Sequence, residues 1–325
     1  MNDRNTAIDF LKMTAIIAVI LLHSMTIGMR NMIGGPYHIL QAVPLFIMIS
    51  GYNSMNSVTR QSLDYKQQYQ FDLLSKKFQR LLQPFTLIFI VEMALLQLVG
   101  QLRISGVPLA YIKGGFGPGS YYVPLMIQLT LLVPILIEFV RRFPKGTLFI
   151  VTVCSLGLEF FFWKIHLQNE IYRQLLIRYI LPLTLGVYAA LYREKIRYIW
   201  ILLAGCSLVY ISGVEYLYWT SFAQVDWRSQ NTLAFFYPFA LFLLVIERMR
   251  FREGLFSRLT VLVGKSSYHI YLIQMLYFWT GLPIRIGLVQ DSLKGAVFSV
   301  VICVLLGILF YKLDNRILKW RIRRV

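Results

Sequence analysis

Long apolar runs recur along the whole chain, and they constrain its fold more than any other feature. An α-helix needs about 20 mostly apolar residues to cross a bilayer. Ten stretches of this kind lie near residues 10–29, 38–57, 83–101, 121–140, 147–163, 175–192, 198–215, 230–247, 266–283 and 295–312. The pattern predicts an all-α, polytopic transmembrane helix bundle of about ten spans, which forms a single domain over residues 1–325.

The charge balance fits the same fold. Hydrophobic residues make up 57% of the chain and charged residues only 15%. The charged residues comprise 33 Lys and Arg but only 15 Asp and Glu, which gives a net charge of +18. A nucleic-acid-binding protein gathers its basic residues on a polar face, whereas here they separate apolar runs. We therefore expect a lipid bilayer as partner, with cytoplasmic Lys and Arg near anionic head groups, and no nucleic acid.

The distribution of basic residues predicts the orientation in the membrane. With the N-terminus inside, the inner segments hold 23 of the 33 Lys and Arg and the outer segments hold 9. Short cytoplasmic loops collect these residues, so the chain is predicted to be a multi-pass protein of the cell membrane with both termini cytoplasmic. The inner segment 58–82 is predicted to be a basic loop with an interfacial helix, and 313–325 a basic tail at the membrane surface.

Two further expectations concern loops and metals. The outer segment 106–120 is rich in Gly and Pro and is predicted to lack regular structure. His38, His166 and His269 are placed near helix ends or loops and have no partners at metal-ligand spacing, so we predict no metal site.

The first apolar run carries three ionisable residues, which are costly inside a membrane and therefore candidates for function. Asp9 and Lys12 lie at its inner end and His23 near its outer end. Lys12 and His23 are eleven positions apart, so on a helix they share one face about 16 Å apart. A cation at the inner end can hold an anionic cofactor, and a neutral imidazole farther out can accept a proton from a hydroxyl. The simpler alternatives are a packed histidine, a lysine that snorkels to the interface, and Asp9 as its ion-pair partner.

The second apolar run contains Ser50, Gly51 and Tyr52. Small residues such as Ser50 and Gly51 let membrane helices approach closely, so a helix–helix contact is the first interpretation of these two residues. Ser50 is predicted to lie inward of the membrane midplane and His23 outward, so Ser50 is not expected to act as a nucleophile beside His23. We assign it instead to the inner, cofactor-binding end of the polar stripe.

These residues resemble the start of the membrane acyltransferase-3 family, whose hallmark is an Arg or Lys ahead of a histidine at this spacing. The resemblance rests on an ordered set: Asp9, Lys12, His23, Phe46 to Tyr52, the basic stretch Lys76 to Pro84, the aromatic segment Gly119 to Pro124, and Gly264 to Gln274. It extends over nearly the whole chain. Gln274 stands where many members have His, and Lys12 stands where most have Arg.

The resemblance implies an integral membrane acyltransferase. Its reaction would move an acyl group, expected to be acetyl, from cytoplasmic acyl-CoA to a hydroxyl of a cell-envelope or exported glycan or a lipid-linked saccharide. No cofactor would be bound permanently, because acyl-CoA serves as a co-substrate. Carried over by position, His23 matches the essential histidine and Lys12 the basic residue, and together they form the predicted catalytic pair.

The remaining candidates divide into a donor group and a supporting group. Lys76, Lys77 and Arg80 lie on the predicted cytoplasmic side, where they can attract the phosphates of CoA; together with Ser50 and Gly51 they are the predicted cofactor-binding residues. The three basic residues can equally be ordinary anchors of an inner loop. Asp9, Tyr52, Tyr121 and Tyr122 are predicted to support the substrate, although tyrosines near an outer interface are also typical of the aromatic belt.

Two other functions remain open from the sequence. A transporter or flippase for a polysaccharide or lipid-linked sugar would line a path with Lys12 and His23. A structural partner of a polysaccharide synthase would not depend on His23 at all.

Overall fold

The chain folds into helices throughout. The computed structural model describes residues 6–192, 197–221, 227–288 and 292–322, with the backbone alone for 318–322, and within these ranges it contains no β-strand. The all-α prediction is confirmed for this part of the chain.

Six helices among the described residues are long and apolar enough to cross a membrane. They are α1 (Thr6–Ser24), α5 (Phe71–Leu98), α7 (Tyr122–Arg142), α8 (Pro144–Lys164), α11 (Tyr198–Tyr216) and α15 (Leu293–Ile322), the last over Leu293–Ile317. The other four predicted spans overlap α4 (Ala42–Arg60), α10 (Ile180–Leu191), α12 (Phe236–Arg248) and α13 (Leu255–Trp279). Of these, α10 and α12 are short, whereas α4 and α13 carry many polar residues.

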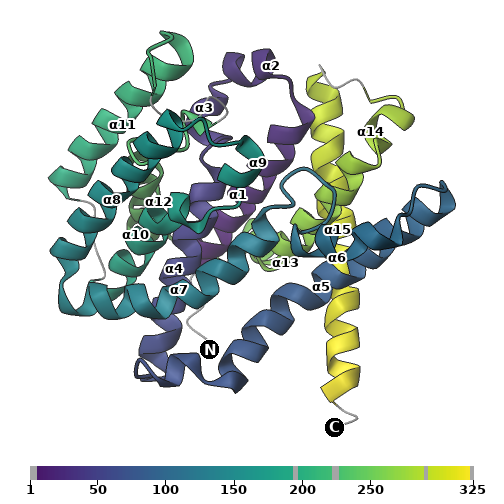
Figure 1. Ribbon diagram of the computed structural model, residues 1–325, viewed down its shortest axis with the longest axis horizontal. Helices are drawn as coiled ribbons and strands as arrows, with labels where there is room; N and C mark the ends of the chain where they lie inside the picture. The colour runs from purple at the N-terminus through teal and green to yellow at the C-terminus, as the bar shows by residue number, and fades with distance from the viewer. Residues whose placement is uncertain (1–5, 193–196, 222–226, 289–291, 323–325) are drawn as a thin grey trace. The chain divides into compact units, whose positions relative to one another are not determined.

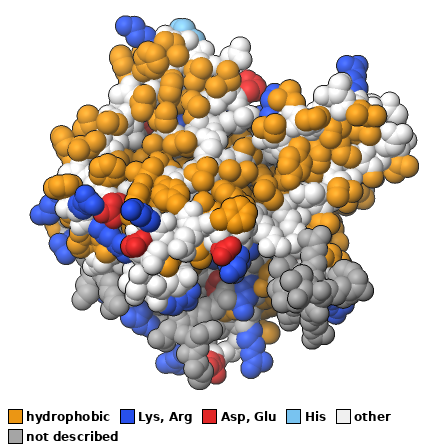
Figure 2. Space-filling model, turned by 60° about the horizontal axis from the view of Figure 1, so that its bottom comes forward, with side chains coloured by type: hydrophobic (Ala, Val, Ile, Leu, Met, Phe, Trp, Pro, Cys, Tyr) orange, Lys and Arg blue, Asp and Glu red, His pale blue; other side chains and the backbone are white. Residues whose placement is uncertain are grey.

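Apolar side chains remain exposed on the long helices. Examples are Ile90 on α5, Phe149 on α8, Ile201 on α11 and Leu305 on α15, and hydrophobic side chains cover much of the surface seen in Figure 2. Water would penalise an apolar surface of this extent, whereas lipid tails do not. The chain is therefore a multi-pass membrane protein.

The helices divide into two compact units, each described by itself. Unit 1 comprises Met1–Ile33, Lys77–Pro124 and Phe251–Val325, and unit 2 comprises Gly34–Lys76 and Leu125–Arg250. Unit 1 also contains α2 (Ile27–Met32), η2 (Ile104–Gly106), α6 (Val107–Ile112) and α14 (Leu282–Arg285). Unit 2 also contains α3 (Gly35–His38), η1 (Gln67–Tyr69), α9 (Asn169–Tyr172) and η3 (Leu176–Tyr179). Figure 1 shows the labelled helices along the chain.

Unit 1 is built around α13, which packs against α1 and α15. Asp9 of α1 lies against Gly264, and His23 lies against Phe278. Asp9 and His23 are 14 residues apart, as are their contacts Gly264 and Phe278, and both pairs rise in the same order. α1 and α13 therefore run parallel. Toward α15 the order reverses, because Ile270 lies against Gly307 and Tyr277 against Ser299. α15 is therefore antiparallel to α13.

Three boundaries differ from the prediction. The first span ends at Ser24 because Thr26 is extended and caps α2. The basic stretch 76–80 belongs to no separate interfacial helix, since α5 starts at Phe71 and continues through Pro84. The prediction that 106–120 lacks regular structure is wrong at its start, where α6 forms with a proline in its first turn, a position that lacks an intrahelical donor in any case.

Unit 2 is centred on α4 and α10. A Cβ at Gly51 would collide with the backbone of Leu183, and one at Gly186 would collide with the backbone of Met48. The two helices approach this closely only because both positions lack a side chain.

Candidate functional site

Lys12 and His23 lie on one uninterrupted helix, α1. Their eleven-residue separation places them on the same face, about 16 Å apart along the axis. Both side chains are half-buried, and the ring centroid of His23 is 6.0 Å from that of Phe278 on α13. The helix thus provides the geometry of the predicted stripe, with a cation at one end and an imidazole at the other.

Asp9 lies at the N-terminal start of this stripe and is 2% exposed. A Cβ at Gly264 would lie 2.6 Å from the backbone oxygen of Asp9 and 2.7 Å from its Cβ. Gly264 therefore allows α1 to approach α13 at this level. The first residue of the Gly264 to Gln274 stretch thus has a packing role in unit 1.

The predicted donor-side cations lie on the first turns of α5. Lys76 and Arg80 are exposed and Lys77 is half-buried. Lys77 and Arg80 are three residues apart and belong to unit 1, whereas Lys76 ends a segment of unit 2. Because α5 is helical here, the cations are held on a rigid element rather than on a loop.

A buried polar cluster joins α5, α13 and α15 one turn beyond Arg80. His269 Nε2 and Asp314 Oδ2 are 2.9 Å apart, and Gln83 Nε2 donates to Asp314 Oδ1 over 2.8 Å. His269 and Asp314 are 8% and 4% exposed. Contrary to the prediction for His269, this residue lies within a helix and has an acidic partner. No local pattern points to that partner, which is 45 residues away.

Two further polar residues of α13 hold a glycine-rich loop, residues 113–120. The Tyr271 hydroxyl donates to the Gly119 carbonyl over 2.7 Å, and Gln274 Nε2 donates to the Pro118 carbonyl over 3.3 Å. Gly114, Gly115 and Gly119 have φ values of 89°, 90° and 88°, a conformation that disfavours other residues. The loop is thus fixed against α13.

The two predicted tyrosines follow this loop. Tyr121 is buried, and the Tyr122 ring is tilted against Tyr271 with centroids 5.2 Å apart. Both therefore belong to unit 1, together with His23 and Lys12. Ser50, Gly51 and Tyr52 belong to unit 2, where Gly51 contacts α10 and Tyr52 packs on Phe242 with ring centroids 5.4 Å apart.

Several membrane carboxylates have structural partners. Glu159 accepts hydrogen bonds from the backbone and hydroxyl of Thr232, Glu215 pairs with Arg228, and Glu138 pairs with Arg142. Glu92 is fully buried, and a Cβ at Gly115 would lie 2.6 Å from its Oε2 atom. Of these four, Glu92 is the carboxylate beside the glycine-rich loop.

Unit 2 also buries a cation among aromatic rings. The Arg178 guanidinium lies 4.4 Å from the ring centroid of Tyr172 and 4.0 Å from that of Trp227. Burial raises the pKa of Tyr172 to about 12, so its hydroxyl stays protonated at neutral pH. Glu159 lies near enough to interact electrostatically with Arg178. Cation–π contacts therefore stabilise a charge in the interior of unit 2.

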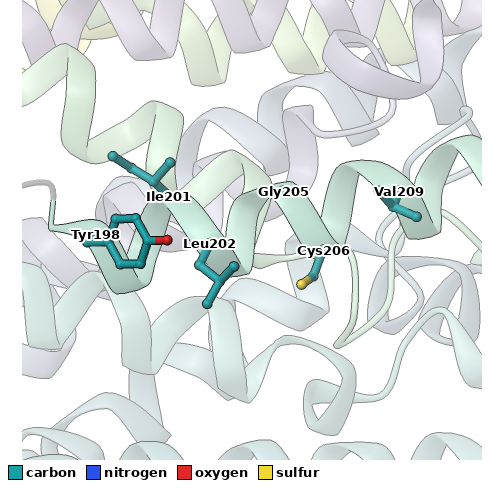
Figure 3. Close-up of a pocket in the computed structure, with 6 residues that line it drawn as sticks. All are labelled: Tyr198, Ile201, Leu202, Gly205, Cys206 and Val209. Carbon is teal, nitrogen blue, oxygen red and sulfur yellow. The ribbon is translucent and has the colours of Figure 1, made fainter.

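An apolar depression of about 550 Å³ lies on α11 (Figure 3). Its lining comes from a single helix: Tyr198, Ile201, Leu202, Gly205, Cys206 and Val209. These residues repeat at helical spacing and present no charged group, so the depression is suited to lipid chains rather than to acyl transfer.

The family model described as an acyltransferase domain, that of the acyltransferase-3 family, matches residues 5–312. The chain belongs to the acyltransferase-3 family. No curated protein matches the chain, and no solved structure matches it. The family assignment confirms the resemblance recognised from the sequence motifs, and it makes this membrane protein an acyltransferase.

Proposed function

We propose that this acyltransferase moves an acetyl group from cytoplasmic acyl-CoA to a hydroxyl of a cell-envelope glycan, with His23 as general base. The observation that carries the proposal is the α1 stripe, in which Lys12 and His23 share one face of a helix packed against α13. A stripe of about 16 Å runs from the predicted cytoplasmic rim, where acyl-CoA is available, into the outer half of the bilayer, nearer to the envelope glycans.

In the proposed reaction, the imidazole of His23 accepts the proton of the sugar hydroxyl as its oxygen attacks the thioester carbonyl. The carbon–sulfur bond then breaks, and the CoA thiolate receives the proton from His23. The products are the acylated glycan and free CoA thiol. The phenylalanine against His23 limits the motion of its ring, which favours a defined position for the base.

The donor is proposed to enter from the α5 cations. Lys77 and Arg80 present positive charge within unit 1, and Lys76 adds to it at the start of the same helix. CoA carries several phosphate charges, so these residues raise its local concentration. Lys12 then supplies charge along α1 toward His23. Asp9 supports the inner end of the stripe, and Tyr121 and Tyr122 the acceptor end.

The ten-span layout with cytoplasmic termini is part of the proposal. Parallel membrane helices are separated along the chain by an odd number of crossings, and α1 and α13 are parallel. The ten-span layout has seven crossings between them: α4, α5, α7, α8, α10, α11 and α12. α13 is not one of the six helices above, but it lies along α1 over 14 residues, so in this proposal it crosses the membrane beside α1. With α5, α7, α8 and α11 alone between them, the number would be even, so the parallel directions favour at least one further crossing, as the ten-span layout provides.

The function is tested in cells that carry the wild type, His23→Ala or His38→Ala. Ester-linked acyl groups on surface glycan and total exported glycan are measured at equal protein abundance. Loss of a general base costs at least about 100-fold, so His23→Ala should abolish acylation while export stays normal. His38, which is exposed on α3, is the matched control and should retain acylation. Lost export with intact acylation would instead identify a transporter.

A further inference from the structure

Three aromatic rings line up beside the glycine-rich loop of unit 1. The rings of Phe89 and Phe116 are 6.5 Å apart with an interplanar angle of 4°, and those of Phe116 and Trp279 are 5.5 Å apart at 25°. Phe89 is buried, whereas Phe116 is 41% exposed and Trp279 is half-buried. We call Phe89, Phe116 and Trp279 the aromatic platform. Its buried ring supports the two rings that remain accessible.

The platform lies at the same end of unit 1 as the proposed base. Trp279 directly follows Phe278, the residue whose ring contacts His23. Both positions are at the C-terminal end of α13, which runs parallel to α1, so platform and base share the same end of unit 1. In the proposed topology this is the outer end, where a glycan is available.

Polar groups adjoin the platform. Gln274, about one turn before Phe278, is fully buried, and its Oε1 atom has no hydrogen-bond partner although its amide nitrogen is bonded to Pro118. A buried acceptor without a partner is costly unless a ligand or water satisfies it. Glu92, one turn beyond Phe89 on α5, brings a carboxylate against Gly115 of the same loop. Hydroxyl donors of a ligand would complement both groups.

The loop that carries Phe116 is held rigidly. Gly117 packs so closely on α13 that a Cβ would lie 2.5 Å from the Met275 carbonyl oxygen. The Gly119 carbonyl also accepts a hydrogen bond from Tyr271 of α13. Phe116 is therefore presented from a fixed backbone, which lowers the entropy that ordering a binding surface would cost.

We propose that the aromatic platform and Gln274 form the acceptor subsite, and that it takes one pyranose ring of the glycan. The apolar C–H faces of a pyranose ring stack on aromatic rings. The hydroxyl groups at its edge form hydrogen bonds with amides and carboxylates. The inference rests on the proposed function and adds the chemical identity of the group placed next to His23. Trp279 and Phe116 act here as specificity-determining residues that contact the acceptor.

The test separates acceptor binding from donor binding. Membranes containing each variant receive acetyl-CoA and surface glycan extracted from His23→Ala cells, and the release of CoA thiol is measured. Stacking on one aromatic ring is worth about 1 kcal/mol, so Trp279→Leu should raise KM for the glycan by about fivefold to tenfold. KM for acetyl-CoA should stay within about twofold of the wild type. Trp279→Phe keeps a ring and should recover most of the loss.

The matched control is Phe298→Leu. Phe298 is an exposed ring on α15 of the same unit and lies outside the platform, so its loss should leave both KM values unchanged, whereas Phe116→Leu should raise the glycan KM alone. An unchanged glycan KM in Trp279→Leu and Phe116→Leu would overturn the subsite and leave the proposed function intact. No glycan-dependent thiol release by the wild type would overturn the proposed function itself.

Discussion

At the scale of single residues, the proposed chemistry of this acyltransferase depends on charge and on proton transfer at two positions of one helix. Lys12 and His23 require only a straight α1 to share a face, and at His23 that face contacts Phe278 of α13. Local spacing on one uninterrupted helix is therefore enough to predict the shared face. Their roles in catalysis remain proposals that substitution can test.

Lys12→Arg should keep most of the acylation activity, because the proposed role of Lys12 needs a positive charge at the inner end of the stripe. Lys12→Gln preserves much of the length without the charge and should lower activity by at least about tenfold. Ester formation on surface glycan at equal protein abundance measures both. An inactive Lys12→Arg protein at normal abundance would contradict a role for charge alone.

At the scale of secondary-structure elements, α13 organises unit 1. Gly264 allows α1 to pack closely, and His269 pairs with Asp314 of α15. Tyr271 and Gln274 form hydrogen bonds to the glycine-rich loop. The Tyr268 hydroxyl also donates to the Leu81 carbonyl of α5. These contacts explain why α13 is polar for a membrane helix: many of its polar side chains face other protein elements rather than lipid.

Gly264→Ala should destabilise the protein, because the new methyl group would meet the backbone of Asp9. Overpacking of this kind costs about 1–3 kcal/mol. The measurement is the Tm of the purified protein in detergent, with Gly205→Ala on α11 as control. No atom lies within 4 Å of a Cβ at Gly205, so that substitution should keep or raise the Tm. Equal Tm values for the two variants would argue against close packing of α1 on α13.

At the scale of the whole molecule, the number of membrane crossings decides which side each site faces. Length and composition support six spans among the described helices. The distribution of basic residues predicts ten, and the parallel directions of α1 and α13 favour more crossings than those six. With the N-terminus inside, the two layouts assign opposite sides to the loops that flank α5. Labelling of these loops therefore distinguishes the layouts.

Ser62→Cys and Gln101→Cys provide this test in a background whose native cysteines are replaced by alanine. Both positions are exposed. In the ten-span layout a membrane-impermeant maleimide should label Gln101→Cys in intact cells, and Ser62→Cys only after the membrane is permeabilised. The reverse pattern would support the six-span layout. Denatured samples labelled in parallel control for the reactivity of each thiol.

The sequence by itself determined the helical membrane fold, the polar stripe of α1 and the family, because each depends on local composition or on an ordered set of motifs. It misplaced the start of α5 and the structure of 106–120, where apolar content alone does not mark a boundary. Only the tertiary structure decided that His269 pairs with Asp314, that Gln274 holds the glycine-rich loop, and that Phe116 reaches Trp279. These partners are 45 to 163 residues apart, and contacts at such separations depend on how the helices pack rather than on any local period.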